Sequence, residues 1–150
     1  YTGTGMTQGG NTNALLLNTN AILNAGTGTL TIGGAANQFS IAASSTTTNE
    51  MVLAAASANI TINSTIVNNG ANASGVTVTG PSTVTLVGNN TFTGNTTASG
   101  GTLAVNADGA LGATGKVTIN TGGTVLLGGQ TIAGEVEREA GVPVLVIRIG

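Results

Sequence analysis

Neither cysteine nor histidine occurs in this sequence of 150 residues. Without cysteine the chain has no disulfide, no thiolate nucleophile and no cysteine-ligated metal site. Without histidine it lacks the most common general base and metal ligand. We therefore expect no bound cofactor, no metal centre and few routes to catalysis.

Charged and aromatic residues are also scarce. Three basic and five acidic residues give a net charge of -2. Three basic side chains cannot form the positive stripe that binds nucleic-acid phosphates. The aromatic residues are Tyr1, Phe39 and Phe92, which are too few for a platform on which bases stack. The sequence therefore predicts no nucleic-acid partner.

Long hydrophobic runs are missing as well. No apolar run approaches the roughly 18 to 20 residues that cross a bilayer, so we expect no membrane span. The chain begins at Tyr1 without a charged leader or an initiator methionine, which indicates a processed or excised product. Its positive mean hydropathy and low net charge argue against disorder. A neutral surface of Thr, Asn and Gly suits a secreted or cell-surface protein, and that is the location we expect.

What the sequence has instead is a series of short apolar segments with period-two alternation. In Ile60-Thr61-Ile62, for example, two apolar side chains point to one side of a strand and a threonine to the other. Such segments predict strands and no helices, in a chain of suitable length for one domain. They occupy 30–32, 39–41, 51–53, 60–62, 76–78, 84–86, 103–105, 117–119 and 125–127, with Phe92 and Ile132 as single apolar anchors between them.

The predicted strands recur at a regular interval. A step of three strands, counting Phe92 as one of them, predicts a parallel β-solenoid with three strands per coil, in which stacked coils share one core. Three such steps are similar in length, and they run from Val76 to Leu103, from Leu30 to Ile60 and from Leu103 to Ile132.

Clusters of glycine and asparagine separate the strands. They supply the positive-φ corners that a three-sided coil needs. An antiparallel sandwich is the alternative fold, but its core usually contains several aromatic residues and its hairpins have two-residue turns. We favour the solenoid because the chain has few of either. The clusters are at 33–34, 68–70, 88–90, 100–101, 122–123 and 128–129.

The end of the sequence differs from the rest. Five of the eight charged residues lie in 135–150, and the run at 142–149 is apolar on both faces when extended. We therefore divide the chain into solenoid coils at 1–134 and a distinct C-terminal strand at 135–150. The residues at 1–12 have little apolar content and are expected to form a loose lead-in or a first edge.

Two roles are open for this C-terminal strand. It caps the last coil, where charged side chains blunt an exposed sheet edge. Alternatively, it docks as an added strand on a neighbouring subunit, where backbone hydrogen bonds give affinity and alternate side chains set the register. The residues predicted for the intersubunit strand are Val142, Val144, Leu145, Val146, Ile147 and Ile149.

Candidate catalytic residues are few. Glu50 and Asp108 are the only carboxylates before Gly134, and no second titratable group is near either of them in sequence. Acid-base catalysis needs such a partner, so we expect solvated turn residues and no enzyme. The segment 112–116 lacks the glycine spacing of a phosphate loop. Five Asn-x-Ser/Thr sequences, which are common by chance in such a composition, begin at Asn59, Asn63, Asn72, Asn89 and Asn95.

Residues 84–112 read VTLVGNNTFTGNTTASGGTLAVNADGALG. An alternating strand is followed by a Gly-Asn-Asn-Thr-Phe-Thr-Gly turn, a Thr-Thr step, a Gly-Thr-Leu strand and a closing Ala-Leu-Gly, with Asn95 where a second glycine is usual. This segment resembles the autotransporter-associated β-strand repeat of bacterial passenger domains. The resemblance implies a right-handed parallel β-helix carried outside the cell, and it brings no catalytic residues.

These observations favour a structural role. A solenoid has two open ends, and here few charges keep the ends of two copies apart. We therefore expect head-to-tail assembly with copies of itself into a surface filament or matrix fibre. The alternative is the stalk or binding module of an autotransporter-like adhesin, whose Thr and Asn ladders contact glycans of a host or a neighbouring cell. A β-helix polysaccharide enzyme would need a cluster of Asp, Lys and Arg, which the chain lacks.

Overall fold

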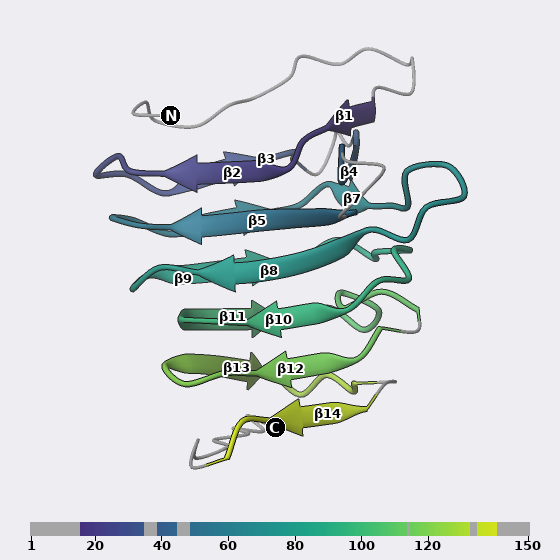
Figure 1. Ribbon diagram of the computed structural model, residues 1–150. Helices are drawn as coiled ribbons and strands as arrows, with labels where there is room; N and C mark the ends of the chain where they lie inside the picture. The colour runs from purple at the N-terminus through teal and green to yellow at the C-terminus, as the bar shows by residue number, and fades with distance from the viewer. Residues whose placement is uncertain (1–15, 35–38, 45–48, 114, 133–134, 141–150) are drawn as a thin grey trace.

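The computed structural model describes residues 16–34, 39–44, 49–113, 115–132 and 135–140. These residues form fourteen strands in three parallel sheets (Figure 1). No helix occurs among them. The all-β class, expected from the alternation, and the parallel sheets, expected from the recurrence of the strands, are therefore confirmed.

The six-stranded sheet faces the viewer in Figure 1, and we call it the front sheet. From top to bottom it consists of β2 (Ala21–Asn24), β5 (Glu50–Ala55), β8 (Gly75–Thr79), β10 (Thr96–Ala98), β12 (Val117–Ile119) and β14 (Val136–Arg138). The five-stranded back sheet consists of β3 (Leu30–Ile32), β6 (Ile60–Ile62), β9 (Thr83–Leu86), β11 (Gly101–Val105) and β13 (Gly123–Leu127). The side sheet has three strands, β1 (Leu16–Asn18), β4 (Ser40–Ala42) and β7 (Thr65–Ile66).

Neighbouring strands in all three sheets are parallel and never consecutive in sequence. The chain passes from a front strand to a back strand and returns to the next level of the front sheet. Val76 of β8 pairs with Thr96 of β10, which in turn pairs with Val117 of β12. Successive levels therefore stack one below another, an arrangement compatible with a β-solenoid.

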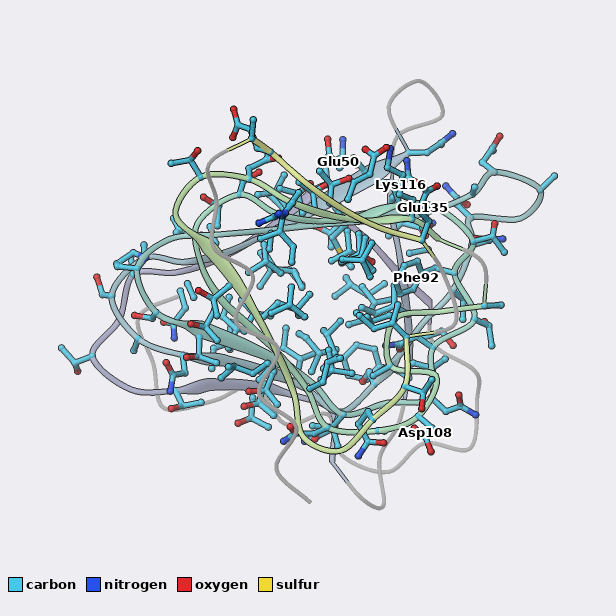
Figure 2. All side chains as sticks on the ribbon, turned by 90° about the horizontal axis from the view of Figure 1, so that it is seen from below. Glu50, Phe92, Asp108, Lys116 and Glu135 are labelled. Atoms are coloured by element: carbon cyan, nitrogen blue, oxygen red, sulfur yellow. The ribbon has the colours of Figure 1, made fainter. Side chains whose placement is uncertain are left out.

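Side chains alternate between the interior and the surface, as the sequence pattern predicts. In β6, Ile60 and Ile62 are fully buried whereas Thr61 is half-buried. Apolar side chains fill the space between the sheets, and Phe92 lies among them (Figure 2). Burial of one such side chain stabilises the fold by about 1.5 to 3 kcal/mol, so the apolar residues of each level hold the sheets together.

Strands are present at all nine segments where alternation predicts them. The bounds of β3, β6 and β12 are as predicted, β4 is shifted by one position, and β5, β8, β9, β11 and β13 extend beyond the predicted triplets. The structure adds β1, β2, β7, β10 and β14. Of these, β10 has only Thr96 and Ala98 as inward residues. Because neither side chain is large and apolar, the hydrophobic pattern of the sequence does not predict this strand.

The prediction that one coil runs from Val76 to Leu103 is wrong, because these two residues do not lie in the same sheet. Phe92 is buried, but the segment between β9 and β10 in which it lies contains no strand. Leu103 lies in the back sheet and pairs with Val84, whereas Val76 lies in the front sheet. The step from Leu30 to Ile60 is confirmed, because these two residues pair directly. The coil that separates Val84 from Leu103 is shorter than this one, so coil length varies along the chain.

The number of strands per coil also changes along the chain. The side sheet ends at β7, and the described residues between β9 and β10 and between β11 and β12 contain no strand. The lower levels therefore have two strands each, whereas three were expected. The step from Leu103 to Ile132 is wrong for a related reason: Ile132 lies outside any strand, and Val125 is the residue that pairs with Leu103.

Glycine is required at the ends of the strands for two different reasons. Gly101 has a φ of +63°, a conformation that favours glycine, as the sequence predicts. Gly88 is not among the positive-φ glycines, but a Cβ built there would lie 2.7 Å from the Ser64 carbonyl oxygen. At Gly88 the requirement for glycine is therefore close contact between successive levels.

Candidate functional site

The six residues predicted for an intersubunit strand lie outside the described residues; they are Val142, Val144, Leu145, Val146, Ile147 and Ile149. The preceding part of the tail is described. Strand β14 pairs in parallel with β12 and extends the front sheet by one strand, with all three side chains exposed. Within the described chain, β14 is the lower edge of the front sheet.

The two candidate carboxylates lie on different sides of the molecule (Figure 2). Glu50, expected in a turn, is on the outer face of β5 and accepts a hydrogen bond from the Thr77 hydroxyl of β8. Asp108 lies in the turn after β11, where its Oδ1 accepts a hydrogen bond from the Thr131 amide at 3.4 Å. The structure does not bring the two carboxylates together. In the part of the chain that is described, no group of three or more acidic side chains is placed to hold a metal ion.

Asn90 has a structural role that sequence reasoning missed. Its side chain is buried, its Oδ1 accepts a hydrogen bond from the Ile66 amide at 2.6 Å, and its Nδ2 donates to the Ala110 carbonyl at 2.6 Å. The three residues belong to three successive levels of the stack, on the side where the lower levels have no strand. The asparagine therefore supplies the hydrogen bonds that strand pairing supplies elsewhere. The signal in the sequence was the Asn-Asn pair before Phe92.

The outer face of the back sheet is uncharged. Thr31, Thr61 and Thr85 lie side by side in β3, β6 and β9, and Ala104 and Leu126 continue the column in β11 and β13. None of these five strands contains a charged residue. The face therefore presents hydroxyl and methyl groups in register.

The charged residues concentrate on the front sheet and its lower end. Lys116 precedes β12 and forms an ion pair with Glu137 of β14. Glu139 accepts hydrogen bonds from the amide and the hydroxyl of Thr121, both at 3.0 Å, and these bonds hold the pKa of Glu139 below its ordinary value. The Lys116 and Glu137 side chains are 34% and 52% exposed. Such a pair contributes at most about 1 kcal/mol.

Large exposed apolar side chains lie at the two ends of the front sheet. Leu23 of β2 is 50% exposed and Val136 of β14 is 44% exposed. Beside β2, Leu17, Ile22, Leu23 and Leu30 contribute to the lining of a hollow of about 280 Å³. Both ends of the described stack therefore expose apolar groups next to an edge strand.

The part of the chain that the structure describes holds no helix of the length and apolarity needed to cross a membrane. Comparison of the chain with protein-family models, with curated proteins and with solved structures gives no match.

Proposed function

We propose that the chain is an extracellular structural subunit that assembles head-to-tail into a surface filament or matrix fibre. In this proposal the coils belong to a right-handed parallel β-helix of the autotransporter-repeat type, with a third strand only in the upper levels, where the side sheet lies. Parallel strands joined by a crossover connection are right-handed in nearly all proteins, which supports that winding. The lower end of one copy stacks on the upper end of the next.

The edges of the front sheet carry the proposal. Among the described residues, β2 and β14 each pair with one strand only. An edge strand presents unpaired amide and carbonyl groups that pair readily with another chain. Because every strand pair in the sheet is parallel, β14 of one copy and β2 of the next can continue the same pattern. A contact of this kind joins two different surfaces and does not close on itself, so it generates filaments.

Apolar groups at the two ends support the same contact. Stacking would cover Leu23 and Val136 together with the hollow that Ile22 helps to line. Strand β2 carries no charge, so it offers no like charge to the acidic residues near β14. We also assign the predicted intersubunit strand at 142–149 to this contact, where its two apolar faces would be buried.

Deletion of residues 135–150 tests this function. Sedimentation velocity of the full chain is expected to show large, concentration-dependent assemblies. The truncated chain, which lacks β14 and the strand that we assign to the contact, is expected to sediment as a monomer and to keep a β-sheet circular dichroism spectrum. A full-length chain that stays monomeric at high concentration contradicts the proposal.

The stalk or binding module of a surface adhesin is the second candidate function. The uncharged threonine column of the back sheet favours it, because hydroxyl groups in register offer repeated hydrogen-bonding positions to a glycan. Under this function the truncated chain keeps its binding to cells or glycans although it no longer assembles. Under the filament function alone, neither protein binds them.

A further inference from the structure

A polar hollow of about 270 Å³ lies on the outer face of the front sheet, away from both ends of the stack. Its lining includes Asn49, Glu50, Gly75, Asn95 and Thr97. These residues come from three successive levels, at β5, β8 and β10. The hollow is distinct from the surfaces at which copies would stack.

Gly75 opens this hollow. It pairs with Glu50 on the strand above, and the Val76 amide bonds to the Asn95 carbonyl on the level below. Neighbouring strands are about 4.8 Å apart, so the backbones of Glu50 and Asn95 are separated by roughly 10 Å. Because glycine has no side chain, the space between these two polar residues stays open. A Cβ at Gly75 would lie 3.2 Å from the Asn95 carbonyl oxygen and would narrow it.

Asn49, at the rim of the hollow, has two unfavourable features. Its φ of +48° makes it the one non-glycine residue with positive φ in the described chain. Its side-chain Oδ1 is buried without a hydrogen-bond partner. Strained backbone and unsatisfied buried polar atoms oppose folding, and both concentrate at binding sites.

The lining offers hydrogen-bond donors and acceptors together. The Glu50 carboxylate is an acceptor, held in place by the Thr77 hydroxyl. The Asn95 Oδ1 accepts a hydrogen bond from the Lys116 amide at 3.3 Å, and its Nδ2 is a donor. The Thr97 hydroxyl both donates and accepts. A ligand whose groups also donate and accept, such as a polyhydroxylated ring, matches this set.

We propose that the hollow binds one pyranose ring, the terminal sugar of a surface polysaccharide, with vicinal hydroxyls on the Glu50 carboxylate and the Asn95 amide. The site is complete within one chain, so the proposal is independent of filament assembly. It extends the filament function, because assembly would repeat the site once per subunit and raise the avidity for a surface. No aromatic residue lines the hollow, and a single site is therefore weak, with a Kd of about 1 mM.

An NMR titration of the ¹⁵N-labelled full chain tests this site, with the methyl glycosides of mannose and galactose and with N-acetylglucosamine as probes. At least one sugar is expected to shift the amide signals of Glu50, Gly75, Asn95 and Thr97 in a saturable way. Glu50→Gln is expected to weaken binding about tenfold or more, since a hydrogen bond to a charged group is lost. Asp108→Asn, on the other side of the molecule, is expected to leave it unchanged.

Two further variants separate shape from chemistry. Gly75→Ala narrows the hollow and is expected to weaken sugar binding, whereas Thr97→Val keeps the shape and is expected to weaken binding by removing one hydroxyl. The proposal is overturned if no sugar shifts these signals, if calcium chloride alone shifts them and sugars do not, or if Gly75→Ala and Thr97→Val both bind as the unaltered chain does.

Discussion

The side chain of Asn90 donates a hydrogen bond to the carbonyl oxygen of Ala110 at 2.6 Å, one level further down the stack. The same side chain accepts the Ile66 amide from the level above. One buried asparagine therefore connects three levels where the lower coils have no strand on that side. The Gly-Asn-Asn-Thr-Phe segment is thus a hydrogen-bonded connector in this fold.

Asn90→Ala is expected to lower the free energy of unfolding by about 2 to 4 kcal/mol, because it leaves a buried amide and a buried carbonyl without partners. Urea denaturation followed by circular dichroism measures the change. The neighbouring Asn89 is exposed, so Asn89→Ala is the matched control and is expected to change stability by less than about 0.5 kcal/mol. Equal effects of the two substitutions would show that the connector does not stabilise the stack.

Gly101→Ala is expected to destabilise the fold more than Gly70→Ala. Both glycines have positive φ, which costs an alanine about 1 to 2 kcal/mol. A Cβ at Gly101 would also overlap the carbonyl oxygens of Gly80 and Ser82, whereas nothing lies within 4 Å of one at Gly70. Thermal unfolding of both variants gives the order, and a lower Tm for Gly70→Ala would contradict the close stacking of levels at Gly101.

Glu139 is expected to contribute to the acid sensitivity of the lower end of the stack. The Thr121 amide and hydroxyl stabilise its ionised form, so its pKa is lower in the folded chain than in the unfolded chain. The resulting stability is present above the unfolded pKa and is lost as pH falls through the folded pKa. Glu139→Gln is expected to remove this part of the pH dependence.

NMR titration of the Glu139 carboxyl carbon measures this pKa directly. In Thr121→Val the pKa is expected to rise only part of the way towards its ordinary value, because the backbone amide, which is the larger cause, remains. An unshifted pKa in the unaltered chain would contradict the hydrogen bonds between Glu139 and Thr121.

Leu23→Glu is expected to weaken assembly, because it places a negative charge on the uncharged end strand β2, which we assign to the contact with the acidic residues near β14 of the next copy. Val87, directly after β9, is the matched control: it is 37% exposed but lies on the back of an interior level. Val87→Glu is expected to assemble normally. Light scattering compares the two variants, and normal assembly of Leu23→Glu would place the contact elsewhere.

The strands with large inward side chains were predictable from the sequence, whereas the path between them was not. Ile60 and Ile62 reveal β6 because a branched apolar pair flanks a threonine. Thr96 and Ala98 are just as inward in β10, but their small side chains give no hydrophobic signal. Phe92 gave the opposite error: its size indicated a strand, yet no strand forms there. Its amide donates a single hydrogen bond to the Ile66 carbonyl oxygen on the level above.

The polar hollow could not be predicted for a related reason. Glu50 and Asn95 are far apart in the sequence, and only the register of β5, β8 and β10 places Gly75 between them. Glu50 was recognised as one of few carboxylates, but the sequence does not show which residues lie beside it in space. The register depends on the number of residues in each coil. This number changes from coil to coil, so a fixed repeat length does not predict which residues pair.

X-ray fibre diffraction from the concentrated, aligned protein tests the central claim most directly. Head-to-tail stacking continues the parallel sheets along the filament axis, with strands perpendicular to it. The account predicts unbranched filaments and a meridional reflection at about 4.8 Å, the spacing of neighbouring strands. A solution of monodisperse monomers, or filaments whose reflection at this spacing lies on the equator, would contradict it.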